Sequence, residues 1–208
     1  MINTGISLER FDKPFLHYLG EGLVSPEDIS ALNAVLPDRE IYSREIKTGS
    51  EHRKEYRMWR SEVALESVRA PVADRLAPPW SKLVDSVLSS DFRHWLSENV
   101  KIDLAPCPQT VGLYVFEDGD YTTIDTGKEE KALTFALYLN EFWEEGFGGN
   151  YQLYSAKEPA ASPDRQIVPI GGRCTTMTPG PSTWHRIQQV DSGGRADRLV
   201  MMLEFWRP

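Results

Sequence analysis

The sequence predicts a mainly β fold of the α+β class, an antiparallel jelly roll supported by helices from the N-terminal half. Two observations carry this prediction. From about residue 110, short apolar runs alternate with turns rich in Gly, Pro and Asp, which is typical of many short antiparallel strands. Before that point, apolar residues recur at intervals of three and four, which indicates amphipathic helices.

Two helices are predicted in the first half. Ser25 suits an N-cap, Pro26 suits the first helical position, and Pro37 ends the segment. A second helix is predicted over residues 78–96, "PPWSKLVDSVLSSDFRHWL", where apolar residues follow a helical spacing. We expect both apolar faces to be packing surfaces rather than binding sites.

The second half predicts seven or eight short strands. Seven of them correspond to the runs "TVGLYVF", "ALTFALYL", "NYQLYS", "RQIVPI", "RCTTMT", "HRIQQV" and "RLVMMLEFW". With 208 residues the chain suits one domain. We therefore expect a jelly-roll core over residues 106–208 and a helical support with a lid segment over residues 1–105.

Composition narrows the class of function. The chain has 23 basic and 31 acidic residues, a formal charge of −8, which argues against a dedicated nucleic-acid-binding protein. Charged residues near the start and the lack of a long apolar run predict neither a signal peptide nor a membrane span. We expect a cytoplasmic protein that handles a small molecule, with buried free thiols at Cys107 and Cys174. The sequence does not set an oligomeric state.

Residues 123–125 and His185 have the spacing of a metal site with one ligand replaced. A facial-triad iron site uses a His, one spacer and a carboxylate on a strand, then a second His far downstream. Here the spacer and the carboxylate are Ile124 and Asp125, but the first His position holds Thr123. His185 follows Asp125 by 60 residues (185 − 125), which suits ligands on two strands that meet in the folded barrel. Asp125 as a turn residue and His185 as a core histidine are the competing interpretations.

Several further motifs follow one another in the second half. They are Gly119-Asp120, Thr123-Ile124-Asp125, Tyr138-Leu139-Asn140, Trp143, Gly148-Gly149, Pro169, "STWHRIQQV" around His185, and Arg198 ahead of "LVMMLEFW". In this order and spacing the chain resembles the iron(II)/2-oxoglutarate oxygenase superfamily, especially its prolyl-hydroxylase-like branch. The resemblance covers about residues 110–208 well and the helical half loosely. It implies a double-stranded β-helix of the cupin-like kind.

The resemblance also implies roles for single residues. Asp125 and His185 would ligate iron(II), and Arg198 would bind the distal carboxylate of 2-oxoglutarate through paired charge-assisted hydrogen bonds. Arg198 is preferred to Arg195 because it opens the last strand, as the anchoring residue of the family does. Tyr138 would bind the same carboxylate of 2-oxoglutarate. The competing interpretation is a half-buried aromatic side chain whose hydroxyl faces water. The implied activity is hydroxylation or a related C–H oxidation of a small molecule, for example in specialised metabolism.

Thr123 keeps other functions open. A threonine hydroxyl is a weak ligand, so we expect weak iron binding that depends on 2-oxoglutarate. Thr123 would lie beside the metal without a bond to it, and it is also a candidate substrate-binding residue. His52 is a candidate replacement ligand. The alternatives are a metal-poor or metal-free descendant that acts as a binding module or a non-oxidative enzyme, and a metal-dependent cupin enzyme that does not use 2-oxoglutarate.

The segment 43–60, "SREIKTGSEHRKEYRMWR", is basic within an acidic chain. One interpretation is a solvated face whose cations pair with its own glutamates. The other is a lid whose cations, Arg57 and Arg60 above all, bind an anionic substrate. Similar N-terminal segments in the resembled family cover the barrel mouth.

Overall fold

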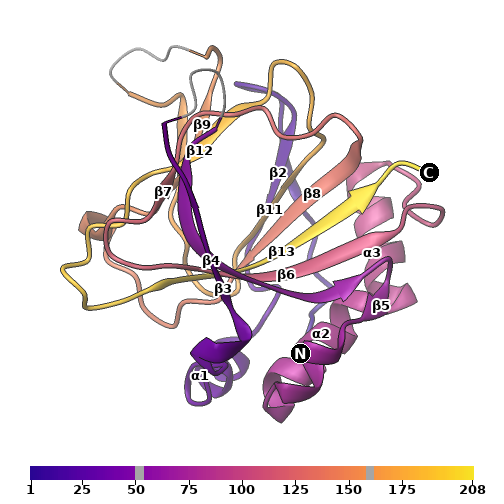
Figure 1. Cartoon of the computed structure of the whole chain (residues 1–208). Coiled ribbons are helices and arrows are strands. Elements are labelled where there is room, and N and C mark those ends of the chain that lie inside the picture. Colours follow the sequence, from indigo (N-terminus) through magenta and orange to yellow (C-terminus); the bar gives the residue numbers. More distant parts are fainter. Residues whose placement is uncertain (50–53, 158–161) are drawn as a thin grey trace.

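The computed structural model describes residues 1–49, 54–157 and 162–208, which form two antiparallel sheets and three α-helices (Figure 1). Among these residues the larger sheet contains ten strands: β1 (Glu9–Phe11), β2 (His17–Gly20), β3 (Ser43–Lys47), β4 (Tyr56–Leu65), β5 (Val68–Arg69), β6 (Gln109–Phe116), β7 (Tyr121–Thr122), β8 (Lys131–Tyr138), β11 (Cys174–Met177) and β13 (Arg198–Trp206). Their order is β1-β2-β11-β8-β13-β6-β4-β3, and β5 and β7 also pair with β4.

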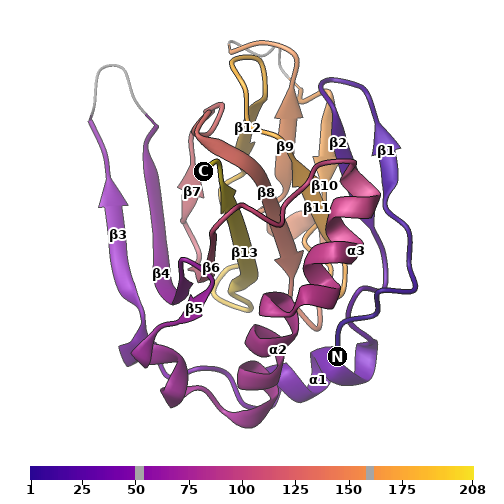
Figure 2. The ribbon, with the colours of Figure 1, turned by 90° about the vertical axis from the view of Figure 1, so that its right-hand side faces the viewer.

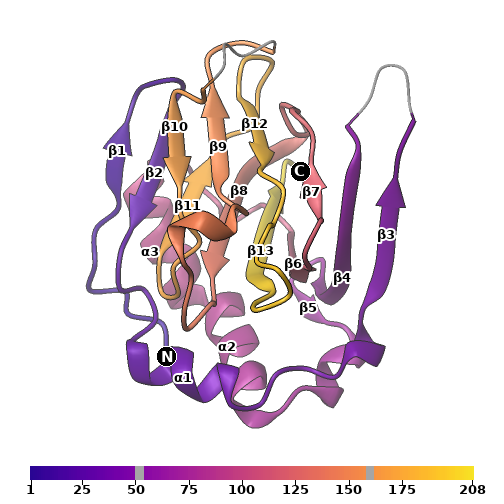
Figure 3. The same cartoon turned by 90° about the vertical axis from the view of Figure 1, so that its left-hand side faces the viewer.

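The smaller sheet consists of β9 (Tyr151–Tyr154), β10 (Arg165–Ile167) and β12 (Trp184–Ile187), in the order β10-β9-β12. It lies on one face of the larger sheet (Figure 3). The helices α2 (Pro78–Leu88) and α3 (Ser90–Val100) cover the opposite face, and α1 (Pro26–Asn33) lies beside α2 (Figure 2). The predicted jelly roll with supporting helices is confirmed, and a space between the two sheets is left for a site.

The main core lies between α2, α3 and the larger sheet. Trp80 of α2 is 2% exposed and donates from its indole nitrogen to the Leu32 carbonyl oxygen at 3.0 Å. Phe92 of α3 meets Phe135 of β8 edge to face, with ring centroids 5.5 Å apart. Such contacts hold α2 and α3 on the side of the sheet away from the smaller sheet, so the inner face remains free for other side chains.

The predicted helix over 78–96 is two helices. Ser89 is extended, with ψ 152°, and it ends α2 while its hydroxyl accepts a hydrogen bond from the Phe92 N–H at 3.2 Å to cap α3. A serine hydroxyl can replace a helical backbone hydrogen bond and so begin a new helix. The spacing of the apolar residues does not predict this break at Ser89. All seven quoted apolar runs, by contrast, contain strands of the structure, β6 and β8 to β13.

The N-terminal half contributes five strands that the sequence did not predict, β1 to β5. The basic segment is a hairpin of β3 and β4, paired from Ser43 opposite Arg60 to Lys47 opposite Tyr56, and β4 joins β6. The two described strands of the segment expected to be a lid are therefore part of the larger sheet. Both Cys107 and Cys174 are buried and free, as expected. No helix in the described ranges is long and apolar enough to span a membrane.

Candidate functional site

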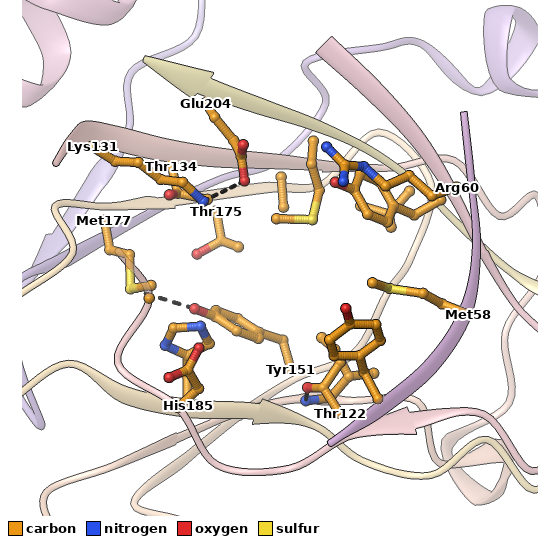
Figure 4. A pocket seen from close by; sticks show the side chains of 18 of the residues that line it. Met58, Arg60, Thr122, Lys131, Thr134, Tyr151, Thr175, Met177, His185 and Glu204 are labelled. Carbon is orange, nitrogen blue, oxygen red and sulfur yellow. Dashed lines mark hydrogen bonds and ion pairs between the residues drawn. The ribbon is translucent and has the colours of Figure 1, made fainter. Parts of the chain in front are cut away.

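A cavity of about 560 Å³ lies between the two sheets (Figure 4). Alternate residues of two strands form much of its wall, because successive side chains of a strand point to opposite faces. They are Tyr56, Met58, Arg60 and Glu62 on β4, and Arg198, Val200, Met202, Glu204 and Trp206 on β13. Across the cavity, β12 contributes His185 and β9 contributes Tyr151. The site thus has walls from both sheets.

Asp125 and His185 lie side by side at one part of the cavity wall. Each backbone N–H donates to the other residue's carbonyl oxygen, both at 2.9 Å. His185 Nδ1 lies 2.8 Å from the Thr183 carbonyl oxygen. A carbonyl oxygen can only accept, so Nδ1 carries the proton and Nε2 keeps a free lone pair. The two side chains that the sequence predicted as ligands are therefore brought together.

Lys54, which the sequence analysis did not single out as a site residue, is the immediate neighbour of this pair. Its ammonium nitrogen lies 3.4 Å from Asp125 Oδ2. Burial lowers the pKa of His185 to about 4, and the Lys54 charge adds to that shift. Burial alone would raise the pKa of Asp125, but Lys54 and a Thr126 backbone hydrogen bond bring it below its ordinary value. At neutral pH the imidazole is neutral and the carboxylate is ionised, which are the forms that bind a metal.

Thr123 is hydrogen-bonded to Glu55. Its hydroxyl accepts a hydrogen bond from the Glu55 N–H at 2.8 Å, and its own N–H donates to the Glu55 carbonyl oxygen at 2.9 Å. The side chain is thus held against the segment that leads into β4, and the preceding residue, Thr122, lines the cavity instead. Thr123 is not among the described residues that line the cavity, and its place beside a metal and a substrate stays a prediction. His52 falls outside the described residues.

A buried arginine and a buried tyrosine, Arg198 and Tyr138, line one end of the cavity, its deep end. Arg198 is 2% exposed, and its Nε donates to the Gly149 carbonyl oxygen at 2.7 Å. In the described part of the chain, neither Arg198 Nη1 nor the buried Tyr138 hydroxyl makes a hydrogen bond of good geometry, although the two side chains lie close enough to affect each other's pKa. The Arg198 guanidinium carbon lies 5.3 Å from the centre of the Tyr138 ring. Buried polar groups without partners are destabilising, so their presence here points to a ligand that completes them.

Burial lowers the pKa of Arg198 to about 10, so it stays charged at neutral pH, and raises the pKa of Tyr138 to about 12, so its hydroxyl keeps its proton. A carboxylate could therefore accept from both side chains. The alternative anchor, Arg195, lies over the Phe147 ring and pairs with Glu144 at 3.5 Å, with 63% of its side chain exposed. The structure thus separates the two arginines, and only Arg198 lines the cavity.

A charged group of residues lies across the cavity from His185 (Figure 4). Lys131 and Glu204 form an ion pair at 2.5 Å, and both side chains are largely buried. Arg60 pairs with Glu62 and lies over the Tyr114 ring, while its buried Nε lacks a partner in the described residues. Of these residues, only Arg60 is a substrate-binding candidate from the sequence.

Arg57, the second predicted substrate residue, is on the other face of β4. It lies one position away from Tyr56 and Met58, which face the cavity, and its side chain is exposed. The period-two pattern of the strand separates Arg60 from Arg57. Had the segment been read as a strand, the same pattern would have placed Lys54 and Arg60 on one face.

The fold and the cavity define a jelly-roll protein that can hold an anion at a buried arginine and a cation at an Asp–His pair. Residues 114–206 match the family model described as the 2OG-Fe(II) oxygenase superfamily. The match lies within the jelly-roll half, so this part of the chain is similar to that superfamily, whose members are described by iron(II) and 2-oxoglutarate.

Among curated proteins, the chain is similar to prolyl 3-hydroxylase OGFOD1 of Mus musculus, with 26% identity over 133 residues, and of Xenopus laevis, with 27% identity over 119 residues. These matches cover 62% and 55% of this chain but only 24% and 23% of the relatives, so the chain spans about a quarter of their length.

Solved structures share the fold. A prolyl 4-hydroxylase of Pseudomonas putida aligns over 92% of both chains, with a TM-score of 0.57 and 14% identity. HygX of Streptomyces hygroscopicus, solved with nickel and 2-oxoglutarate bound, aligns over 91% of this chain and 82% of its own, with a TM-score of 0.56 and 10% identity. At these identities the likeness shows the fold alone.

The cavity residues fit 2-oxoglutarate better than they fit a metal ion. The partnerless Arg198 Nη1 and Tyr138 hydroxyl fit a carboxylate of 2-oxoglutarate. For a metal, Asp125 and His185 supply two donors, and the described residues contain no group of three His, Cys, Asp or Glu that could hold an ion. A metal here would rely on a bidentate cosubstrate for its remaining ligands.

Proposed function

We propose that this chain is a 2-oxoglutarate-dependent oxygenase that oxidises a C–H bond of a small molecule at a two-ligand iron site. Arg198 and Tyr138 bind the distal carboxylate of 2-oxoglutarate, while Asp125 and His185 hold iron(II). The observation that carries the proposal is the pair of buried groups without partners at the deep end of the cavity, on the two residues that the resemblance assigns to the cosubstrate.

Each residue has a defined task in this proposal. Arg198 fixes the cosubstrate by two parallel hydrogen bonds and is itself oriented by the Gly149 carbonyl oxygen. His185 presents Nε2 because Thr183 holds Nδ1. When bound, iron(II) supplies the activation of oxygen, a step for which the protein has no side chain of its own. The methionines at positions 58, 177 and 202 line the cavity and keep water from the reacting centre.

A small substrate suits the cavity volume, since about 560 Å³ is within the range of sites for small ligands. The curated relatives are named as prolyl hydroxylases, so free proline derivatives and prolyl peptides both belong in the first substrate screen. A peptide substrate would retain the cofactor roles proposed here and change only the substrate.

The test is a fluorescence titration with 2-oxoglutarate under anaerobic conditions, with and without iron(II). Trp206 lines the cavity and serves as the reporter. We expect saturable quenching that is stronger with iron(II), and release of succinate when oxygen is admitted. No binding of 2-oxoglutarate in either condition would contradict the proposal and favour a cupin enzyme that does not use it.

A second candidate is a metal-free descendant that binds 2-oxoglutarate or a similar diacid without oxidising anything. The observation in its favour is that Lys54 already neutralises Asp125 at 3.4 Å. In the same titration this candidate predicts equal binding with and without iron(II), and no succinate.

Charge reversal at Arg60 should weaken the binding of an anionic substrate. Losing a charge-assisted hydrogen bond costs about 1.5–3 kcal/mol, so Arg60→Glu should raise KM by about 10- to 100-fold. Arg57→Glu is the matched control on the outer face of the same strand, and it should leave KM unchanged. The measurement is the KM of whichever anionic compound stimulates succinate release. Equal KM values for wild type and Arg60→Glu would remove Arg60 from the substrate site.

A further inference from the structure

The cation nearest to the proposed metal ligands belongs to the protein itself. Lys54 Nζ lies 3.4 Å from Asp125 Oδ2, and both residues line the cavity. Asp125 is at the same time fixed to His185 by the two backbone hydrogen bonds between them. A divalent ion bound to this carboxylate would therefore lie within a few ångströms of the ammonium, and like charges at that separation repel each other.

The position of Lys54 follows from Thr123. The Thr123 hydroxyl accepts from the Glu55 N–H at 2.8 Å, and the backbones of Thr123 and Glu55 are also hydrogen-bonded. Glu55 directly follows Lys54, so this contact fixes the chain where the lysine side chain turns into the cavity. Beyond it, Tyr56 pairs with Thr122 in the register of β4 and β7. The residue in the first ligand position of the family pattern thus holds the segment that carries the competing cation.

We propose that Lys54 is an internal competitor of the metal, and that Thr123 is the positioning residue that holds Lys54 against Asp125. In this arrangement the ammonium balances the charge of Asp125 while no metal is bound, and an incoming metal ion must displace it. The replacement of His by Thr at position 123 then does more than remove a ligand, because it also supplies the hydroxyl that anchors Lys54. The inference rests on the proposed role of Asp125 as a metal ligand.

The test is calorimetric titration of the full chain with iron(II), run anaerobically with 2-oxoglutarate present, and repeated with manganese(II). Lys54→Met keeps the length of the side chain and removes its charge, and we expect it to lower the Kd for both metals by about tenfold or more. The matched control is Lys128→Met, which removes another lysine of the cavity wall whose ammonium lies over the Trp206 ring, 5.5 Å from its centre. That control should shift the Kd by no more than about twofold.

Two further variants separate competition from a general structural effect. Lys54→Met combined with Asp125→Asn should lose the gain in metal affinity, because the carboxylate that binds the metal is then absent. Thr123→Val should also tighten metal binding, but by less than Lys54→Met does. Thr123→Ser keeps a hydroxyl at this position, so its Kd for the metal should equal that of wild type. In the Lys54→Met background, Thr123→Val should have no further effect on the Kd.

The outcomes are distinct. Metal binding by wild type with an unchanged Kd in Lys54→Met overturns the competition and leaves the proposed function standing. Metal binding by Lys54→Met but not by wild type supports the competition and makes the native chain a metal-free descendant. If neither wild type nor Lys54→Met binds metal, both the competition and the proposed iron site are overturned. The separate titration with 2-oxoglutarate then decides whether the cosubstrate site stands.

Discussion

Arg198→Met should weaken 2-oxoglutarate binding by about 100-fold or more, because it removes two charge-assisted hydrogen bonds from a buried carboxylate site. Tyr138 cannot replace the guanidinium, since it is neutral and its hydroxyl can supply one hydrogen bond. Tyr138→Phe should accordingly have a smaller effect, about three- to tenfold. The measurement is the anaerobic fluorescence titration with 2-oxoglutarate, supported by calorimetry.

Arg195→Met is the matched control, because Arg195 is a mostly exposed arginine three positions earlier in the chain. It should leave the Kd for 2-oxoglutarate unchanged. Arg198 is buried, so far-ultraviolet circular dichroism and a thermal melt of each variant must show that the fold is kept. If folded Arg198→Met bound 2-oxoglutarate as wild type does, the deep end of the cavity would not be the cosubstrate site.

Asp120→Asn should destabilise the fold by about 1.5–3 kcal/mol, because it removes the charge of a buried carboxylate from its ion pair with a partly exposed arginine. The Asp120 side chain is 2% exposed, and both of its oxygens accept from the two terminal nitrogens of Arg44 at 2.6 Å. It also accepts from the Glu117 N–H at 3.0 Å, which shapes the turn before β7. The measurement is urea unfolding followed by tryptophan fluorescence.

The control for this prediction is Asp12→Asn, in the Arg10–Asp12 pair at 2.8 Å. That pair has side chains 58% and 71% exposed, so it should contribute no more than about 1 kcal/mol. Similar unfolding midpoints for Asp120→Asn and Asp12→Asn would show that the buried pair is not a major source of stability. The Gly119-Asp120 motif would then need another explanation.

Most of the second half of the fold could be predicted because seven of its described strands are short apolar runs bounded by turn residues, β7 being the exception. The strands of the first half could not, for a physical reason that β4 illustrates. Its inner face lines a polar cavity with Arg60 and Glu62, while its outer face carries Arg57 and Trp59. With polar residues on both faces, the strand has no clean alternation of apolar and polar side chains to detect.

The residues of the candidate site also divide into those that the sequence predicts and those that it does not. His185, Asp125 and Arg198 could be named because they lie in motifs with recognisable order along the chain. Lys54 could not, because its distance from Asp125 depends on the pairing of β4 with β7, which brings together residues 71 positions apart (125 − 54). Nor does a sequence say which way the Thr123 hydroxyl points at the end of a two-residue strand.

The place of β4 near the edge of the larger sheet has a consequence for how the substrate preference of this scaffold can diverge. Only β3, of the main strand order, lies beyond it, whereas Tyr138, His185 and Arg198 are on β8, β12 and β13, and Asp125 follows β7. Four inward positions of one hairpin, from Tyr56 to Glu62, can therefore be exchanged without altering the strands that carry the cofactor residues. A library randomised at these four positions would vary the substrate wall independently of the chemistry, in the laboratory as in the course of evolution.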